Sequence, residues 1–160
     1  MNNELDLMYR EVILDHYRSP RGRKPIDKSD FTSEGHNPSC GDDITLQVAV
    51  DNGTVKSIYA NCRGCAISTA SGSIMAELLK GKSIDEIKSL ALNVKKMLKG
   101  EEFELPENIG DIDALHGVKN FPVRIKCALL AWMTLLEGIK NYQNGHAKEV
   151  AVISTESGDQ

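Results

Sequence analysis

The sequence is poor in aromatic residues, has no long apolar run and carries no excess of positive charge. Aromatic side chains make up 5% of the 160 residues, and 23 acidic residues against 19 Lys and Arg leave a formal net charge of −4. A surface that holds nucleic acid is normally basic, so this balance argues against a nucleic-acid partner. No apolar stretch reaches the roughly 20 residues that cross a bilayer, which argues against a membrane protein.

The N-terminal residues also lack the apolar segment of a secretory signal, since they read MNNELDLMYR. We therefore expect a cytoplasmic protein. In that reducing compartment, cysteines are more often metal ligands or reactive thiols than disulfides. The four cysteines of this chain, Cys40, Cys62, Cys65 and Cys127, are interpreted in that sense.

Hydrophobic spacing predicts a helix, a β-hairpin and three further helices. Apolar residues recur at helical intervals over 5–16, and this helix ends before Pro20 because a residue preceding proline avoids helical geometry. Alternating apolar residues predict strands over 44–50 and 55–61, joined by a tight turn at Asn52-Gly53. The remaining predicted elements are helices over 66–80, 83–99 and 122–142, and a loop over 100–120 with a short helix near Asp113.

These elements predict an α+β fold in which a small antiparallel β-sheet has helices packed on one face. The length suits one domain with its own hydrophobic core. We expect this single domain to cover residues 1–143. Residues 144–160 are mostly polar and are expected to form a flexible C-terminal tail.

Three cysteines fall near the ends of predicted elements, where a fold can bring distant segments to one metal ion. Cys40 lies in the turn before the first strand, Cys65 lies where the second strand gives way to a helix, and Cys127 lies about one turn into the last helix. Zn²⁺ takes four ligands from Cys, His, Asp or Glu. The helix N-terminus beside Cys65 would also stabilise its thiolate. The placement predicts a metal site that contains these three thiols.

Asp42 and Arg124 are candidate partners of these thiols. Asp42 follows Cys40 across the flexible Gly41, so both side chains can turn toward one cation. Without a cation, the same carboxylate would disfavour the Cys40 thiolate. Arg124 precedes Cys127 by three residues and shares its helical face. We expect Arg124 to offset the negative charge of the site or to hold a sulfur-bearing partner.

The identity of the fourth ligand is open between Asp42 and Cys62 when only the pattern is considered. The segment Cys62-Arg63-Gly64-Cys65 is a CxxC motif, and counting cysteines gives a four-cysteine zinc site. Strand alternation, however, places Cys62 on the same face as Ile58 and Ala60, which is a core face. A thioredoxin-like redox pair is a third interpretation. It is disfavoured because that motif belongs after a parallel strand, whereas here it follows a hairpin.

Four segments of the chain resemble the iron–sulfur cluster assembly scaffold family of the IscU type. They are NPSCGD around Cys40, Gly-Cys-Ala-Ile-Ser at 64–68, FPVRIKC at 121–127 and LDHYRSPRG at 14–22. The resemblance covers about residues 5–142. It implies a fold like the NifU N-terminal domain.

The resemblance also implies a ligand set and a chemistry. It maps the family's metal ligands onto Cys40, Asp42, Cys65 and Cys127, and leaves Cys62 without a role. Family members hold Zn²⁺ or a nascent 2Fe–2S cluster at this site. They accept sulfur as a persulfide from a PLP-dependent cysteine desulfurase.

Three departures from the IscU type resemble the SufU branch of the family. Lys126 stands where IscU scaffolds have a histidine, the segment 121–125 (FPVRI) replaces their Leu-Pro-Pro-Val-Lys, and residues 91–119 look like an insertion. Members of this branch act mainly as zinc-dependent sulfur acceptors that stimulate their desulfurase. The resemblance thus implies a SufS-like desulfurase as partner, and a downstream cluster scaffold or apoprotein as recipient.

The leading hypothesis is a sulfur acceptor of iron–sulfur cluster assembly, in which Cys40 leaves the metal and attacks the persulfide of the desulfurase. One alternative is a scaffold on which a 2Fe–2S cluster is built and transferred. Another is a zinc-stapled interaction module without sulfur chemistry. A Cys62–Cys65 redox enzyme is the least favoured hypothesis. The residues leave open whether the chain is a sulfurtransferase-like enzyme or a non-enzymatic scaffold.

Overall fold

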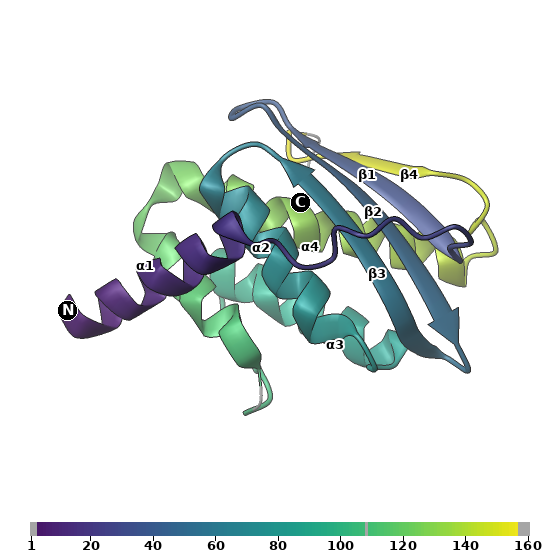
Figure 1. Ribbon diagram of the computed structural model, residues 1–160, viewed down its shortest axis with the longest axis horizontal. Helices are drawn as coiled ribbons and strands as arrows, with labels where there is room; N and C mark the ends of the chain where they lie inside the picture. The colour runs from purple at the N-terminus through teal and green to yellow at the C-terminus, as the bar shows by residue number, and fades with distance from the viewer. Residues whose placement is uncertain (1–2, 108, 157–160) are drawn as a thin grey trace.

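The computed structural model describes residues 3–107 and 109–156 (Figure 1). Its elements in chain order are α1 (Asn3–Arg18), β1 (Phe31–Asn37), β2 (Asp42–Asp51), β3 (Thr54–Arg63), α2 (Ala66–Leu79), α3 (Ile84–Leu98), the 3₁₀ helix η1 (Gly110–Asn120), α4 (Pro122–Gln143) and β4 (Ala151–Ser154). The predicted helices are all present, and η1 is the short helix expected near Asp113. Among the described residues, no helix is long and apolar enough to cross a membrane.

The strands form one mixed sheet in the order β3-β2-β1-β4. The β2–β3 hairpin and the β1–β2 pair are antiparallel, whereas β4 runs parallel to β1. At the hairpin turn, Asn52 and Gly53 have φ angles of 52° and 79°, which is the left-handed region that Asn and Gly adopt most easily. The predicted hairpin and α+β class are confirmed, and the parallel pairing of β4 makes the sheet mixed instead of purely antiparallel.

Two strands, β1 and β4, lie where the sequence predicts none. The buried positions of β1 alternate correctly but include only one large apolar side chain, because they are occupied by Phe31, Ser33, Gly35 and Asn37. β4 lies inside the segment 144–160, which the sequence predicts to be a flexible tail. Its residues satisfy backbone groups of β1 that would otherwise form an open sheet edge, and Ala151 is buried there. Residues 157–160 of this segment lie outside the described residues.

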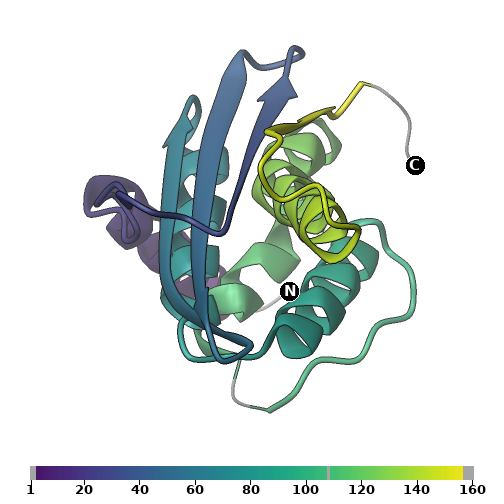
Figure 2. The same ribbon diagram turned by 90° about the vertical axis from the view of Figure 1, so that its right-hand side faces the viewer.

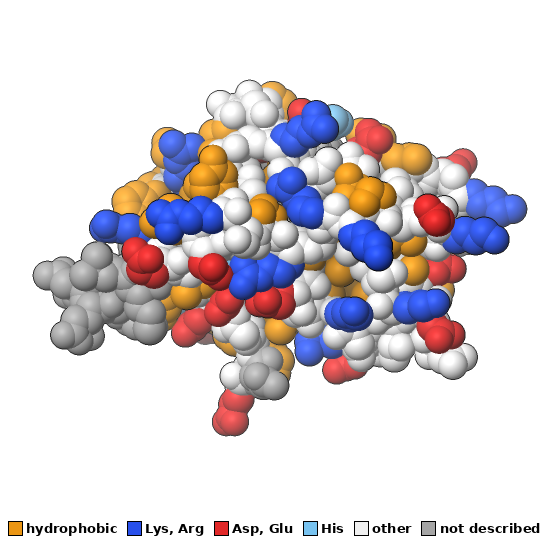
Figure 3. Space-filling view, in the orientation of Figure 1, with side chains coloured by type: hydrophobic (Ala, Val, Ile, Leu, Met, Phe, Trp, Pro, Cys, Tyr) orange, Lys and Arg blue, Asp and Glu red, His pale blue; other side chains and the backbone are white. Residues whose placement is uncertain are grey.

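The helices cover one face of the sheet, and the segment between α1 and β1 crosses the other (Figures 1 and 2). Helices α2 and α4 lie against the strands, while α1 packs on α2 and α3 packs on α4. On the outer face, the backbone N–H of Ile26 donates to Oε1 of Gln47 at 3.0 Å. Basic side chains on this face are interspersed with acidic and apolar ones and do not form one continuous stripe (Figure 3).

Small polar residues let α2 and α4 pack closely together. The hydroxyl of Ser71 donates to the carbonyl of Ala128 at 2.7 Å and accepts the indole N–H of Trp132 at 2.9 Å. All three residues are buried. Because Cys65 precedes α2 and Cys127 lies on α4, this contact fixes the relative position of two of the predicted metal ligands.

Candidate metal centre

Cys40 lies in the turn that joins β1 to β2, as the sequence predicts. The register pairs Asn37 with Asp42, so the turn consists of residues 38–41, and the Cys40 N–H donates to the Asn37 carbonyl at 3.2 Å. Gly41 has a φ of 70°, and a Cβ added there would meet nothing within 4 Å. The Cys40 side chain is only partly buried. The turn therefore presents Cys40 at an open edge of the molecule.

Cys65 occupies the N-cap of α2, with φ −72° and ψ 167°. Its Sγ accepts the backbone N–H of Ser68 at 3.5 Å, so the thiol faces the positive end of the helix dipole. Its own backbone N–H donates to Oδ1 of Asp42 at 2.9 Å. This bond links the start of α2 to the start of β2.

Cys127 is fully buried in the second turn of α4. Its Sγ lies 3.3 Å from the Sγ of Cys40 and 3.6 Å from Nδ2 of Asn37. Burial raises the pKa of the Cys127 thiol, and hydrogen bonding to Cys40 and the nearby Cys65 raise this pKa further. A thiol in these surroundings stays protonated near neutral pH unless a cation joins it.

The structure brings Cys40, Asp42 and Cys127 into one group whose possible ligand atoms all lie within 4.8 Å of one another. Cys65 is not part of this tight group, but it contacts Asp42 through its backbone and influences the pKa of Cys127. A set of thiols with one buried carboxylate suits Zn²⁺, and thiolates also suit an iron–sulfur cluster. The residues present therefore fit either group.

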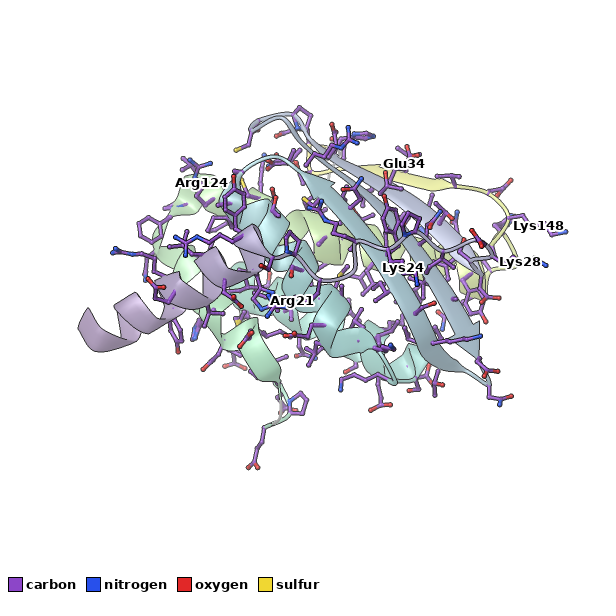
Figure 4. All side chains as sticks on the ribbon, viewed as in Figure 1. Arg21, Lys24, Lys28, Glu34, Arg124 and Lys148 are labelled. Carbon is purple, nitrogen blue, oxygen red and sulfur yellow. The ribbon has the colours of Figure 1, made fainter. Side chains whose placement is uncertain are left out.

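Arg124 supplies positive charge beside these thiols from the first turn of α4 (Figure 4). A hydrogen bond to Cys127 raises the pKa of the exposed Arg124, and the charges of Cys65, Cys127 and Cys40 raise it further. The role that the sequence predicts for Arg124 stays a prediction. Its position suits it to offset the negative charge that deprotonated ligands would carry.

Asp42 and Cys62 differ sharply in their surroundings. Asp42 is 1% exposed, and its carboxylate accepts hydrogen bonds from the Cys65 backbone and from Nδ2 of Asn37. Cys62 shares the buried face of β3 with Ile58 and Ala60, as strand alternation predicts. Burial raises the pKa of Cys62 to about 11. The geometry thus groups Asp42, and not Cys62, with Cys40 and Cys127.

Several residues that support the site are absent from the sequence-based prediction: Asn37, Ser39, Thr155 and Glu156. Asn37 is fully buried and donates to Asp42 Oδ2 at 3.0 Å. Asn37 and Ser39 both lie inside the NPSCGD motif, which is the one signal that could have drawn attention to them. Thr155 and Glu156 act through contacts between distant segments, which no local pattern reveals.

The histidines do not join this group. His36 pairs with Asp43 at 2.6 Å, and Nε2 of His116 lies 3.0 Å from Nζ of Lys119. His16 does lie close to two carboxylates, those of Glu77 and Asp111.

Existing interactions already occupy that second cluster. Nδ1 of His16 contacts the hydroxyl of Ser73 and Nε2 contacts Asp111, both at 2.7 Å, while Arg21 pairs with Glu77 at 3.1 Å. The arrangement links α1 to α2 and η1, and we interpret it as structural.

Comparisons with known proteins agree with one another. The sequence profile of the NifU-like N terminal domain matches residues 8–149. The chain is 39% identical over 145 residues to the zinc-dependent sulfurtransferase SufU of Bacillus subtilis, covering 91% of this chain and 98% of that protein. It is 41% identical over 134 residues to the iron–sulfur cluster assembly scaffold protein IscU of Thermotoga maritima, covering 84% and 94% respectively.

Solved structures share the same fold. A crystal structure from Fervidobacterium islandicum AW-1, described as an iron–sulfur cluster assembly scaffold protein for the SUF system, superposes with a TM-score of 0.73 at 37% identity, covering 81% of this chain and 94% of that one. The N-terminal part of a NifU-like protein from Brucella abortus gives a TM-score of 0.77 at 20% identity, covering 88% and 97%, which extends the likeness of fold.

Proposed function

Because the chain belongs to the NifU-like N-terminal domain family, we propose that it acts in iron–sulfur cluster assembly as a zinc-dependent sulfur acceptor. The observation that carries this proposal is the grouping of Cys40, Asp42 and Cys127 beside Cys65. The choice of zinc and sulfur transfer is supported by the likeness to SufU, which is named a zinc-dependent sulfurtransferase.

The proposed ligands are Cys40, Asp42, Cys65 and Cys127. Zn²⁺ held by them would keep the three thiols deprotonated at neutral pH. The chain itself orients Asp42, since Asn37 and the Cys65 backbone N–H donate to its two carboxylate oxygens.

Cys40 is the proposed sulfur acceptor because it alone of these thiols lies in an open turn. Its thiolate attacks the outer sulfur of a persulfide on the donor enzyme, and a new S–S bond forms on Cys40. The S–S bond to the donor's cysteine breaks, and its electron pair leaves with that cysteine as a thiolate. The outer sulfur keeps its proton as it moves to Cys40. Cys40 therefore ends as a persulfide, and the donor's cysteine ends as a free thiolate.

The donor fits a PLP-dependent cysteine desulfurase of the SufS type, and the recipient fits a cluster scaffold or apoprotein in the cytoplasm. Contact with a protein partner is supported by two apolar side chains near Cys127 that face solvent. Phe121 is 62% exposed and Val123 is 76% exposed, at the start of α4. Apolar residues clustered beside a reactive site favour docking of another protein.

A second candidate function is a scaffold on which a 2Fe–2S cluster is built and transferred. It is supported by the 41% identity to the Thermotoga maritima IscU scaffold and by the suitability of the same thiolates for iron. The two functions use the same residues and differ in what those residues hold.

Zinc affinity of single variants tests the proposed ligand set. We expect Cys40→Ser, Asp42→Ala, Cys65→Ser and Cys127→Ser each to weaken zinc binding by at least about tenfold, whereas the matched control Cys62→Ser keeps the wild-type affinity. Competition with a chromogenic chelator measures these affinities. Loss of zinc from Cys62→Ser, with binding unchanged in Asp42→Ala, would instead support the four-cysteine site.

Anaerobic reconstitution with ferrous iron and sulfide separates the two functions. As a sulfur acceptor, the zinc-loaded protein gains no visible cluster absorption and stimulates its desulfurase. A stable cluster that moves intact to an apoprotein would favour the scaffold.

A further inference from the structure

Strand β4 brings the end of the described chain to the turn that carries Cys40. Its parallel pairing with β1 places Ser154 beside His36, and the backbone N–H of Thr155 donates to the His36 carbonyl at 3.0 Å. Covering the sheet edge requires only the backbone pairing of β4 with β1. The two residues that follow β4, Thr155 and Glu156, make additional side-chain contacts beside the metal centre.

Thr155 determines which way the buried amide of Asn37 points. The Thr155 hydroxyl donates to Oδ1 of Asn37 at 2.9 Å, although the two residues are 118 positions apart in the sequence. The other end of that amide, Nδ2, donates to Asp42 and lies 3.6 Å from the Sγ of Cys127. A reversed amide would turn its oxygen toward a carboxylate and a sulfur, so Thr155 keeps the donor facing the two ligands.

Glu156 ties the turn to the helix on the other side of the site. Its carboxylate accepts the hydroxyl of Ser39 at 2.5 Å and pairs with Nζ of Lys126 at 2.9 Å. Ser39 precedes Cys40 and Lys126 precedes Cys127, so one carboxylate spans the neighbours of both thiols. The Glu156 and Lys126 side chains are 42% and 46% exposed, and an ion pair so exposed is weak and easily opened.

We propose that Thr155 and Glu156 form a clasp that holds the Cys40 turn against α4 and thereby limits the exposure of the Cys40 thiol. The clasp rests on the proposed function, in which Cys40 must reach a persulfide on another protein. Thr155 is a positioning residue that acts through Asn37, and Glu156 acts through Ser39. A partner that competes for the exposed Glu156 carboxylate would release the turn.

The test measures alkylation of each cysteine by iodoacetamide in the metal-free, reduced full-length chain, together with hydrogen exchange of residues 37–41. We expect Thr155→Val, which keeps the shape but removes the donor, to raise the alkylation rate of Cys40 about fivefold. Glu156→Gln and Ser39→Ala should each raise it by about two- to threefold. Amide exchange over the turn should accelerate in the same order.

Two control variants make the result specific. Thr155→Ser retains the hydroxyl and should keep the Cys40 rate within about twofold of the wild type. Val152→Thr alters an exposed position of β4 (61% exposed) and should also leave the rate unchanged. The proposal is overturned if Thr155→Val leaves Cys40 alkylation and exchange of the turn unchanged. It is equally overturned if the rates of Cys40, Cys62 and Cys127 all rise together, because that is general loosening of the fold.

Neither readout depends on sulfur transfer or on bound metal, so the clasp and the proposed function can fail separately. A faster Cys40 rate in Thr155→Val, in a protein that accepts no persulfide, would keep the clasp and reject the acceptor role. Persulfide on Cys40 with unchanged alkylation in every clasp variant would keep the acceptor role and reject the clasp.

Discussion

The metal centre is assembled from a helical half and a turn half that differ in how firmly they are held. Cys65 caps the start of α2 and Cys127 lies on α4, and these two helices pack together through buried residues. Cys40 comes from a turn with an open glycine beside it. The difference indicates which thiol can move, since displacing Cys40 disturbs one turn, whereas displacing Cys127 disturbs the core.

Asp42 stands between these two halves. It follows the Cys40 turn in sequence, yet it is 1% exposed and accepts a hydrogen bond from the backbone N–H of Cys65, the N-cap of α2. The carboxylate therefore joins the turn to the helical half. A site with three firmly held positions and one thiol in a partly exposed turn suits transfer of sulfur better than a closed, four-coordinate structural zinc site.

The largest expected effect comes from breaking the helical half at Trp132, whose side chain is fully buried and whose indole N–H donates to Ser71. We expect Trp132→Ala to lower the free energy of unfolding by about 3–5 kcal/mol, because it leaves a cavity and removes the indole N–H that the Ser71 hydroxyl accepts. Urea denaturation of the metal-free protein measures the change. Val123→Ala, at a 76% exposed position of the same helix, is the control and should stay within about 0.5 kcal/mol. If Trp132→Ala lowers the free energy of unfolding by less than about 1 kcal/mol, the contact of Trp132 with Ser71 does not hold α2 and α4 together.

A smaller effect concerns Cys62, which lies in the core and is not one of the proposed ligands. Its pKa is raised from 9.0 to about 11 by burial, so the folded protein keeps this proton longer than the unfolded chain. The resulting stability is complete below pH 9 and is lost as the pH rises through about 11. Between pH 9 and pH 11, we expect the free energy of unfolding of the wild type to fall by about 2–3 kcal/mol more than that of Cys62→Ala, measured by urea denaturation without metal. If the free energy of unfolding of the two proteins changes equally with pH, burial does not raise the pKa of Cys62.

The smallest effect tests the link between the halves at Gly64. This residue has a φ of 148°, and a Cβ added there would overlap Oδ1 of Asp42. We expect Gly64→Ala to displace the carboxylate and weaken zinc binding by about tenfold in chelator competition. Gly53→Ala is a matched control, because Gly53 also has positive φ (79°) but nothing within 4 Å of the added Cβ. Equal zinc affinity in both variants would show that Asp42 does not bind the metal.

Much of the fold could be predicted from the sequence because its signals are local. Helical spacing located the four α-helices, Asn52-Gly53 located the hairpin, and a capping box of Ser83 with Glu86 marks the start of α3. The sequence did not predict β1, because the core-facing residues after Phe31 are small or polar where α4 approaches the strand closely. At Gly35, an added Cβ would overlap the Thr134 hydroxyl of α4. Glycine is required at such a position by a tertiary contact, and glycine does not favour a β-strand.

The metal centre likewise has one part that the sequence could predict and one part that it could not. Cys40, Cys65 and Cys127 could be proposed because each falls near the end of a recognisable element, whereas the choice of Asp42 over Cys62 depended on the family resemblance. The structure brings Cys40, Asp42 and Cys127 together. The clasp could not be proposed, because it depends on the parallel pairing of β4 with β1 across most of the chain. A four-residue strand in a polar segment has no periodicity long enough to be recognised.

The most direct test of the account is mass spectrometry of the zinc-loaded protein after incubation with a SufS-type cysteine desulfurase and cysteine, with the added sulfur mapped by peptide. We expect a persulfide on Cys40 alone, with Cys62, Cys65 and Cys127 unmodified, and no persulfide in Cys40→Ser. Added sulfur on Cys65 or Cys127 with Cys40 unmodified, or no added sulfur while zinc is retained, would contradict the assignment of the mobile turn as the acceptor.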